Sequence, residues 1–531
     1  MNLASYPSSL SPTRRKAVGI DLGTTFSALS HVDENGRTQI IPNAESERIT
    51  PSVILFDGST AIVGSAAKQN AVAEPEKIVD FVKREMGKSK IEFNREFGGK
   101  LWSAEELSAL ILRKLKQDGE KFLGTPITDA VITVPAYFSD VERTATMHAG
   151  RLAGFEVLQI LNEPTAAALA YGIDKHHGNE TVFVFDLGGG TFDVTIMKIS
   201  EHHIQMLGSN GDHRLGGKDW DDVIVNWVSE EFDSQFNENP LLDLHSYQDL
   251  YNRALTAKIQ LSSRNSATVV HSYAGHSLKI ELTREEFERR SRHLLEKAKA
   301  ICEIAMAEAG LEWNHIDRIL LTGGMTRMPA VREMIRQMSR RPVAEDISPD
   351  EAVAMGAALQ ATLVLLGREN DTGERVISQE TRGKLSTAEG TLVRVTNITT
   401  HTLGVVLWGD ETMEEYVFPM IKKSTPIPAE VENSFGTAKA NMKSVVVRVV
   451  EGESTVPAEC TPLGTCNVEL PPYLPKGSPV QLTYRYDENQ VLEVKVDAYG
   501  NQSVVKISRN LGLNEAEMEE ATADLMRINV E

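Results

Sequence analysis

The sequence predicts an α/β region followed by a smaller antiparallel β domain. From about residue 17 to 365, short β-rich runs such as AVGI, DAVITVP and RILLTGG alternate with helical stretches such as SAEELSALILRKLKQ. This alternation favours a sheet covered by helices on both faces. From about residue 393 to 508, runs such as KSVVVRVVEGE alternate apolar and polar residues between Gly, Pro, Asp and Asn turns. That period of two indicates strands with one buried face.

The order of these patterns divides the 531 residues into segments. Domains usually hold about 100 to 200 residues, so this length predicts three or four of them. We expect a disordered tail at 1–16, the α/β region at 17–365, a polar linker at 366–392, the β domain at 393–508 and a short C-terminal helix within 509–531. The linker is assigned because its residues lose apolar periodicity.

Composition narrows the partners and the compartment. The formal charge of −20 and the pI of about 5.2 disfavour nucleic acid or an anionic membrane surface as the partner. Three scattered cysteines are too few for a disulfide framework or a zinc site, although Cys460 and Cys466 are close enough in sequence to pair. No apolar run has the length of a signal-peptide core or a membrane span. We therefore predict a cytoplasmic protein without a membrane partner.

Two loops of similar sequence occur in the α/β region. AVGIDLGTTFSALS (17–30) and VFVFDLGGGTFDVTI (182–196) each show a strand, then Asp-Leu-Gly, then small residues, then a second strand. Either loop alone is compatible with an ordinary tight turn. Because the pattern occurs twice, we expect two related halves that face one another.

The residue types in both loops suit a nucleoside triphosphate. Backbone N–H groups of small residues make an anion-binding concavity, and Thr24, Thr25 and Thr191 add hydroxyl donors. Asp21 and Asp186 supply carboxylates for Mg²⁺, which needs only one or two protein oxygens beside phosphate and water. We therefore predict one nucleotide clamped between two hairpins.

Three further loops belong to the same predicted site. Glu163 stands before Pro164, at a strand-to-helix junction. Gly323 and Gly324 follow the strand RILLT and precede a helix, where the backbone can approach a ligand closely. ISPDEAV is typical of a helix start with a capping box, which accounts for Asp350 without a ligand.

Six motifs together carry a family resemblance: GIDLGTTFS, VPAYFSDVERTAT, LNEPTAAALAYG, FDLGGGTFDV, LLTGGMTRMPAV and SPDEAVAMGAALQA. They resemble the ATPase domain of the bacterial-type 70-kilodalton heat-shock chaperones, within the actin and sugar-kinase superfamily. The β domain resembles that family's peptide-binding sandwich more distantly. The resemblance implies an actin-like ATPase domain of two related lobes, a smaller antiparallel β-sandwich, and a short form whose helical lid is reduced to its first helix.

The resemblance also implies residue roles. Lys83 matches the family lysine that stabilises charge on the γ-phosphate, although DFVKREMG by itself favours a surface lysine beside Arg84. Pro135 and Arg143 match positions that couple nucleotide state to the peptide domain. The implied catalytic residues are Lys83, Glu163, Asp186 and Thr191, and the implied ligands of Mg²⁺ and K⁺ are Asp21, Asp186 and Asp193. The implied nucleotide-binding residues are Gly23, Thr24, Thr25, Phe26, Gly188, Gly189, Gly190, Thr191, Gly216, Gly217, Lys258, Ser262, Gly323, Gly324, Met325, Arg327 and Asp350.

Three residues depart from the family pattern on the nucleotide side. Phe26 replaces a common tyrosine, Met325 replaces a small polar residue near the expected adenine, and Leu255 stands where a glutamate usually hydrogen-bonds the ribose. Losing one hydrogen bond to a charged acceptor costs roughly 1.5 to 3 kcal/mol. We therefore expect weaker nucleotide binding than is usual in the family.

For the peptide groove, the resemblance points to eight residues of the β domain. They are Val405, Leu407, Trp408, Phe435, Ala438, Val445, Val447 and Val491. Such a lining suits an extended apolar peptide held partly by its backbone. The alternative is that the same side chains fill the core of the sandwich. Trp408 replaces a smaller residue and is expected to narrow the pocket, and LVRVTN (392–397) takes the place of a strongly apolar interdomain linker.

The sequence thus predicts a molecular chaperone that binds and hydrolyses ATP to control its binding of exposed apolar segments of unfolded proteins. The resemblance adds a J-domain co-chaperone and a nucleotide exchange factor as partners. Two alternatives stay open. One is a nucleotide-switched binding module with weak or no hydrolysis, and the other is a metabolic kinase of the same superfamily, which would leave the β domain unexplained. With no lid beyond the first helix, bound peptide is expected to leave quickly.

Overall fold

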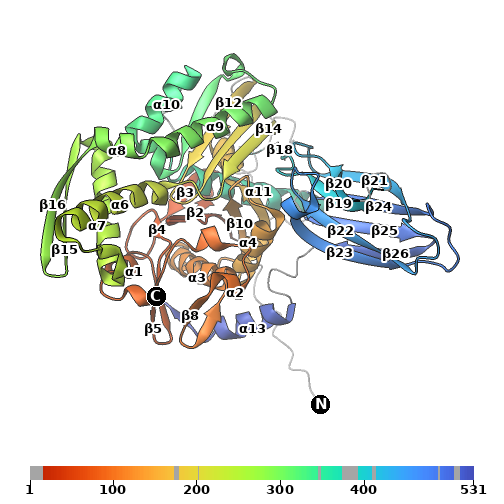
Figure 1. Ribbon diagram of the computed structural model, residues 1–531, viewed down its shortest axis with the longest axis horizontal. Coiled ribbons are helices and arrows are strands. Elements are labelled where there is room, and N and C mark those ends of the chain that lie inside the picture. The colour runs from red at the N-terminus through yellow and green to blue at the C-terminus, as the bar shows by residue number, and fades with distance from the viewer. Residues whose placement is uncertain are drawn as a thin grey trace.

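The computed structural model describes residues 16–172, 179–200, 203–344, 348–372, 385, 393–409, 414–487, 491–506 and 515–531. Figure 1 shows two α/β lobes on the left and a β-sandwich that projects to the right. The predicted tail lies outside the described residues except for Lys16, and so does most of the predicted linker.

Lobe I is built on a mixed sheet with strand order β11-β10-β1-β2-β3, and β4 adds beside β2. Strands β1, β2 and β3 form an antiparallel meander, and β10 runs parallel to β1. These strands are β1 Ala17–Asp21, β2 Phe26–Val32, β3 Thr38–Ile41, β4 Thr50–Pro51, β10 Asp129–Val134 and β11 Glu156–Asn162. A smaller sheet and a hairpin flank it: β5 Ile54–Asp57, β6 Thr60–Val63 and β7 Ile78–Val79, then β8 Arg95–Phe97 and β9 Lys100–Trp102.

Lobe II repeats the arrangement with strand order β17-β12-β13-β14-β18. Strands β12, β13 and β14 form an antiparallel meander, and β17 runs parallel to β12. These strands are β12 Glu180–Leu187, β13 Phe192–Ser200, β14 His203–Asp212, β17 Arg318–Thr322 and β18 Arg394–Thr396, with a separate hairpin of β15 Ser266–Tyr273 and β16 His276–Thr283. Each lobe thus contains a three-stranded antiparallel meander and a parallel strand that pairs with the first strand of the meander. This shared arrangement agrees with the prediction of two related halves.

Two helices, α5 (Glu163–Gly172) and α11 (Ala352–Thr372), lie between the two lobe sheets and pack on each other. Gly356 faces the backbone of Ala166, where a Cβ has no room, so the two helices approach closely. Helix α11 ends at Thr372 and Leu366 is fully buried, so the first residues of the predicted linker belong to this helix. The outer helices are α1 Ser65–Asn70, α2 Lys90–Phe93, α3 Ala104–Leu123 and α4 Asp140–Leu152 in lobe I, and α6 Gly217–Phe236, α7 Leu244–Ser263, α8 Arg284–Arg290, α9 Arg292–Glu308 and α10 Pro329–Ser339 in lobe II.

Local sequence accounts for several of these boundaries. Helix α3 begins at a capping box, in which the Ser103 N–H donates to Glu106 Oε2 (2.8 Å) and the Glu106 N–H donates to Ser103 Oγ (3.1 Å). It ends at Gly124, which adopts the left-handed conformation that glycine allows. Strand β12 contains the apolar run Val182–Phe185, whose alternate side chains enter two different hydrophobic clusters, one on each face of the sheet.

The β domain consists of two four-stranded antiparallel sheets, β20-β19-β22-β23 and β21-β24-β25-β26. Their strands are β19 Leu403–Trp408, β20 Glu415–Ile421, β21 Ala429–Gly436, β22 Ser444–Glu451, β23 Thr461–Glu469, β24 Pro479–Tyr486, β25 Leu492–Ala498 and β26 Asn501–Lys506. The side chains between the sheets form one core, in which the fully buried Tyr484 donates its hydroxyl to Gly404 O (2.9 Å).

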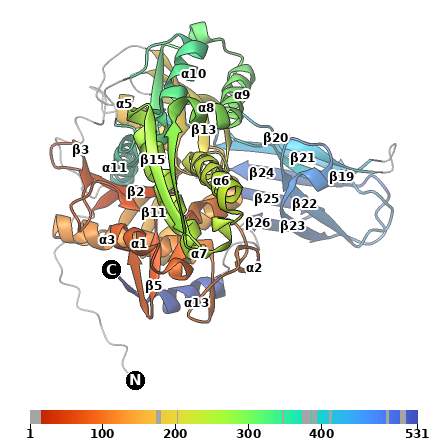
Figure 2. The same cartoon turned by 60° about the vertical axis from the view of Figure 1, so that its left-hand side comes forward.

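Both segments that flank the β domain lie on the lobes. Strand β18, within the predicted interdomain linker, pairs in parallel with β14 and extends the lobe II sheet. Helix α13 (Glu515–Leu525) and strand β27 (Asn529–Val530) lie along lobe I, away from the sandwich, in both Figure 1 and Figure 2. Across the described ranges, no helix combines the length and the apolar character that a membrane crossing requires.

Candidate active site

A cavity of about 390 Å³ lies between the two lobes. Its walls include both hairpin loops that the sequence singled out, together with α5, α6, α7 and the loop that follows β17. Most residues predicted to hold nucleotide or metal line it: Asp21, Gly23, Thr24, Thr25, Phe26, Lys83, Glu163, Asp186, Gly188, Gly189, Thr191, Gly217, Lys258, Gly323, Gly324, Met325, Arg327 and Asp350. The predicted residues outside the lining are Gly190, Asp193, Gly216 and Ser262.

The two hairpin loops fit into one another across the cavity. A Cβ at Gly189 would fall on the Thr25 side chain, and a Cβ at Gly190 would fall on the Thr24 side chain. The lobe I loop therefore contributes hydroxyl side chains, and the lobe II loop contributes bare backbone that makes room for them. This fit gives the triple glycine a packing reason, besides the anion-binding reason that the sequence suggested.

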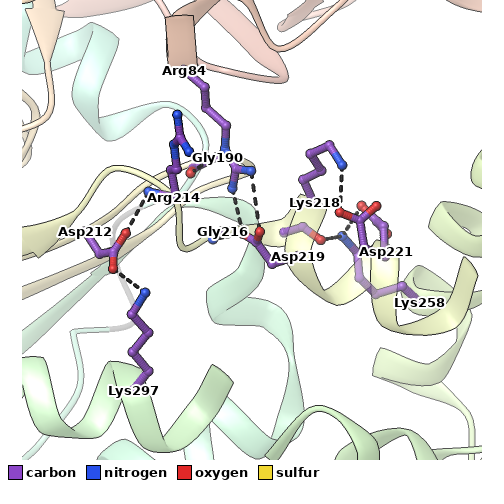
Figure 3. Close-up of polar contacts among 12 residues, drawn as sticks. Arg84, Gly190, Asp212, Arg214, Gly216, Lys218, Asp219, Asp221, Lys258 and Lys297 are labelled. Atoms are coloured by element: carbon purple, nitrogen blue, oxygen red, sulfur yellow. Dashed lines mark hydrogen bonds and ion pairs between the residues drawn. The ribbon is translucent and has the colours of Figure 1, made fainter. Parts of the chain in front are cut away.

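Helix α6 and one arginine hold the triple-glycine loop from behind. The N–H groups of Gly217 and Lys218 donate to the carbonyls of Gly188 and Gly189, both at 2.9 Å. Arg84 of lobe I reaches across the cleft, as Figure 3 shows: its Nε donates to Gly190 O (2.8 Å). The three carbonyls of the loop are thus all occupied by protein donors, so the loop has a defined orientation.

The same arginine also anchors the start of α6. Arg84 Nη2 pairs with Asp219 Oδ2 (2.6 Å), and that carboxylate oxygen accepts the Gly216 N–H (2.8 Å). Gly216 packs directly on Gly190, which explains why both glycines lie behind the cavity wall and not on it. Arg84 therefore joins the lobes at the predicted phosphate loop.

Three aspartates gather at the base of the two hairpins. Asp186 and Asp193 face each other across the β12–β13 ladder and are 7% and 1% exposed, and Asp21 ends β1 in the opposite lobe. Burial raises the pKa of each of the three to about 8, with a further contribution from the Glu163 carboxylate. A site with this much unneutralised carboxylate favours a cation.

The donor set suits Mg²⁺ held jointly with a phosphate ligand. Among the described residues, no three His, Cys, Asp or Glu side chains converge closely enough to hold a metal by themselves. Mg²⁺ typically takes only one or two carboxylates and completes its six oxygens with water and phosphate. The separated aspartates of the cleft match that requirement.

Lys83 and Glu163 form a buried ion pair beside these aspartates. Lys83 Nζ donates to Glu163 Oε1, and both residues are 6% exposed. Burial lowers the Lys83 pKa, but the carboxylates of Glu163 and Asp21 outweigh burial and raise this pKa above its usual value. Lys83 is thus a charged group inside the cleft, and not the surface lysine that its local sequence favours.

The wall on the α7 side is partly apolar. Lys258 Nζ donates to Gly217 O (2.8 Å) and to Asp221 Oδ2 (2.9 Å), whereas Leu255 and Met325 present apolar side chains to the same cavity. Ser262 lies one turn further along α7, where its hydroxyl donates to Lys258 O (3.3 Å). Leu255 offers no hydrogen-bond acceptor at this wall.

At the rim of the cavity, Arg327 and Asp350 form an ion pair. Gly323 has a φ of 80° and lies against the Leu187 carbonyl, so this position needs a glycine. Asp350 therefore has a partner in the cleft, in addition to its place at a helix start.

Comparison with known proteins agrees with this geometry. A family model described as Hsp70 protein matches residues 17–531. Chaperone proteins DnaK from two strains of Thermus thermophilus are each 39% identical to the chain over 542 aligned residues, which cover 96% of this chain and 83% of each relative. The chain belongs to the Hsp70 family.

This membership confirms the family resemblance, the fold class and the function that the sequence predicts. The protein is an ATP-dependent molecular chaperone, and its enzymatic activity is ATP hydrolysis. Hsp70 chaperones bind ATP with Mg²⁺ and bind unfolded polypeptide. The alternatives of a metabolic kinase and of a switch without hydrolysis are not favoured.

Sequence reasoning missed several polar residues of the Hsp70 cleft. Arg84 was considered only as a neighbour of Lys83, and the other missed residues that line the cavity are Lys68, Asp80, Lys218, Asp221 and Tyr251. No local motif singles them out. Arg84 is recognised by its contacts with Gly190 and Asp219 across the cleft, and Asp221 by its pairing with Lys258 on the neighbouring helix.

The β domain contacts the ATPase lobes close to the aspartate cluster. The Tyr137 N–H donates to Asp193 Oδ1 (3.2 Å), and the Tyr137 ring lies 4.4 Å from the ring of His401 in the β domain and 5.2 Å from that of His213. Nearby, Lys423 Nζ pairs with Glu308 Oε1 (2.8 Å). A single residue, Tyr137, therefore touches both a predicted metal ligand and the β domain.

Arg143, a predicted coupling residue, supports this turn from below. It is 3% exposed, and its guanidinium donates to Phe138 O (3.0 Å) and Ala136 O (2.8 Å), in the turn that begins at Pro135. The turn that carries Tyr137 is thus held by a buried charge.

The predicted peptide-groove residues divide into three groups. Val405 and Val447 lie in the sandwich core, at 2% and 6% exposure. Leu407, Phe435 and Val445 are half-buried and pack against this core, and Val491 is half-buried as well. Ala438 and Trp408 are exposed, Trp408 at 48%. The half-buried group matches a groove lining better than the fully buried pair does.

Strand register adds two aromatic residues to this region. Leu407 pairs with Tyr416, and Val405 pairs with Phe418, so each pair shares a face of the sheet. Phe418 stacks edge-on with Phe435, with ring centroids 5.3 Å apart. Because successive residues alternate faces, Trp408 shares the opposite face with Val406.

Proposed function

We propose that this chaperone hydrolyses ATP between its two hairpin loops, and that hydrolysis controls how tightly the β domain holds exposed apolar segments of unfolded proteins. The observation that carries the proposal is the buried Lys83–Glu163 pair in a cavity lined by two phosphate-type loops, with Asp21 and Asp186 in its wall and Asp193 directly behind Asp186. The arrangement combines fixed positive charge, metal ligands and backbone donors in one water-poor cleft. These are the requirements of phosphoryl transfer, which depends mostly on positioning and electrostatics.

Each side chain then has a defined task. MgATP, when bound, supplies the phosphoanhydride bond that is hydrolysed. Asp21, Asp186 and Asp193 hold Mg²⁺ and K⁺ through their carboxylates. Lys83 remains protonated and offsets negative charge at the γ-phosphate, and Glu163 orients it. Further contacts to the phosphates come from Gly23, Thr24, Thr25, Gly188, Gly189, Gly190 and Thr191.

The remaining cleft residues hold the nucleoside. Gly217, Lys258, Gly323, Gly324, Met325, Arg327 and Asp350 surround base and ribose in this proposal, with Phe26 at the opposite wall. Gly216 and Ser262 support this wall from behind, Gly216 through its packing on Gly190 and Ser262 through Lys258. Leu255 supplies no acceptor for a ribose hydroxyl, so nucleotide affinity is lower than a glutamate at this position would provide.

In the β domain, the half-buried Leu407, Phe435, Val445 and Val491 bind the apolar segment, and Val405 and Val447 support them from the core. A J-domain co-chaperone and a nucleotide exchange factor regulate the cycle, and the cytoplasm is the compartment. Peptide release is fast because, among the described residues, no helix lies over the sandwich: α13 lies on lobe I.

The test compares ATP hydrolysis by the wild type, Lys83→Ala and Lys88→Ala, each with and without an unfolded apolar peptide. Lys88 is a matched control because it lies five positions away and pairs with Glu85 near the surface. We expect peptide-stimulated turnover in the wild type and in Lys88→Ala, and loss of turnover in Lys83→Ala. Peptide binding without any turnover in the wild type would contradict the proposal.

A further inference from the structure

Residues 515–531 follow the β domain in sequence but belong to lobe I in space. Strand β27 pairs in parallel with β6, with Asn529 opposite Thr60 and Val530 opposite Ala61. The backbone hydrogen bonds between them include Asn529 N–H to Ser59 O (3.1 Å), Glu531 N–H to Ala61 O (3.0 Å) and Val63 N–H to Glu531 O (2.8 Å). The segment thus completes a four-stranded lobe I sheet, β27-β6-β5-β7.

Side chains of the segment are part of the lobe I core. Ala521, Leu525 and Val530 are 1%, 1% and 5% exposed, and all three pack in the main hydrophobic cluster of that lobe. Burying a leucine or valine contributes roughly 1.5 to 3 kcal/mol relative to exposure. The segment is therefore docked by apolar burial as well as by backbone pairing.

Two cations of lobe I fix the end of α13. Lys100 Nζ pairs both with Asp524 Oδ2 (2.7 Å) and with the fully buried Glu106 (2.9 Å). Arg113 donates to Leu525 O, at the last turn of the helix. These contacts specify one position for the segment, because each cation comes from a different element of the lobe.

The sheet that β27 completes leads directly to Lys83. Its opposite edge is β7, which is followed by Asp80 and Phe81 and then by the 3-10 helix Val82–Glu85. Val82 and Met86, on either side of Lys83, pack in the same hydrophobic cluster as Leu525. The Lys83 segment is therefore supported by the sheet and the core that residues 515–531 complete.

We propose that residues 515–531 are a positioning element of the active site: they hold the Lys83 segment so that its ammonium meets Glu163. The inference rests on the proposed role of Lys83 in hydrolysis. Because a displacement of about 1 Å in a reacting group costs up to roughly a hundredfold in rate, loss of this support affects the rate constant more than nucleotide binding. Nucleotide binding is retained because lobe II supplies much of the cavity wall, including Gly217, Lys258 and Met325.

The experiment uses three variants of the full chain and one deletion. Leu525→Asp removes the core contact, Asn529→Pro removes the N–H that donates to Ser59, and the deletion removes residues 515–531. Met526→Asp is the matched control, since Met526 is adjacent to Leu525 and 76% exposed. We expect the three disruptive changes to lower kcat on the order of tenfold or more, with ATP affinity and KM unchanged. A synthetic peptide of residues 515–531 should restore kcat in the deletion variant.

Hydrogen exchange provides a readout that does not require hydrolysis. The Val63 N–H donates to Glu531 O, and the Arg84 N–H donates to Phe81 O (3.0 Å) next to Lys83. We expect both amides to exchange faster in Leu525→Asp and Asn529→Pro, while amides in the middle of α3 stay protected. If Lys83→Ala leaves turnover intact, the proposed function fails, and the Arg84 amide still decides whether the segment positions the Lys83 loop.

Three outcomes overturn the inference. An unchanged kcat in all disruptive variants shows that the segment does not position Lys83. If kcat and ATP affinity fall together and the amides throughout α3 exchange faster, residues 515–531 only stabilise lobe I as a whole. An unchanged Arg84 amide exchange beside a faster Val63 amide shows that the strand pairing does not reach the Lys83 loop.

Discussion

The cleft between the lobes and the junction with the β domain differ in how they treat charge. In the cleft, Lys83 and Glu163 neutralise each other, and Asp186 and Asp193 remain with pKa values raised to about 8 by burial. At the junction, the Lys423 ammonium pairs with Glu308, and the Tyr137 ring packs on the His401 ring. Carboxylates are left in excess in the cleft, where we propose that a cation and its ligand bind, whereas the ion pair at the domain junction neutralises its own charges.

The largest effect is expected from filling the space in the cleft loop. Gly190→Ala places a Cβ on the Thr24 side chain. Overpacking of this kind typically lowers the free energy of unfolding by about 1–3 kcal/mol, which is about 5- to 150-fold in the folding equilibrium. We expect the free energy of unfolding to fall by about 1–3 kcal/mol, and kcat/KM for ATP hydrolysis to fall as well, because the displaced loop faces the predicted phosphate site. Gly367→Ala is the control, because nothing lies within 4 Å of its Cβ.

A double variant sharpens this result. Thr24→Ala removes the side-chain atoms that the new methyl group meets, so adding it to Gly190→Ala should recover part of the loss. Equal losses in the single and double variants would show that the hairpins do not depend on their mutual fit.

The apolar wall of the cleft gives the second effect. Leu255→Glu adds a charged acceptor at a position that lines the cavity, so ATP should bind at least about tenfold tighter, since such a bond contributes roughly 1.5 to 3 kcal/mol. Leu255→Met, which keeps the wall apolar, should leave the Kd unchanged. Direct titration of nucleotide binding measures both, and equal affinities for both variants would contradict the assigned place of the nucleoside.

The junction should lose stability in acid through His401, whereas the cleft aspartates, with pKa values raised to about 8, shift stability in the opposite direction. Burial, with His213, Lys423 and Arg143 nearby, lowers the pKa of His401 to about 3. Below the usual histidine pKa of about 6.5, an exposed His401 binds a proton that the docked His401 does not bind. Docking therefore weakens as pH falls from 6.5, by up to about 1.4 kcal/mol per pH unit.

The measurement is the free energy of unfolding between pH 7 and pH 5. The wild type minus His401→Leu difference isolates the His401 contribution, so His401→Leu should lose less stability, or gain more, on going to pH 5 than the wild type does. His293→Leu, at an exposed position of α9, should respond as the wild type does. An identical pH response in His401→Leu and the wild type would assign the acid sensitivity of the junction to another group.

The smallest effect belongs to the ion pair of the junction. The side chains of Lys423 and Glu308 are 15% and 34% exposed, and exposed pairs contribute roughly 0.2 to 1 kcal/mol. A double-mutant cycle of Lys423→Ala and Glu308→Ala should give a coupling energy in that range. A coupling above about 2 kcal/mol would mean that the junction depends on charge as strongly as the cleft does.

Local sequence was sufficient for much of the architecture. The two Asp-Leu-Gly hairpins, the alternation of strands and helices and the period-two β domain are encoded in runs of five to fifteen residues, because turn chemistry and apolar spacing act over that range. The residues of both hairpins consequently line one cavity, as the repeated pattern predicted.

What the sequence by itself determined is therefore the set of elements and the chemistry of the two loops. Tertiary structure alone decided that Lys83 is buried, that Arg84 reaches Gly190 across the cleft, and that Asn529 pairs beside Thr60. These contacts join residues far apart in the chain, and no local period records them. The same holds for the β domain, since an alternating apolar strand has one pattern whether its side chains fill a core or line a groove.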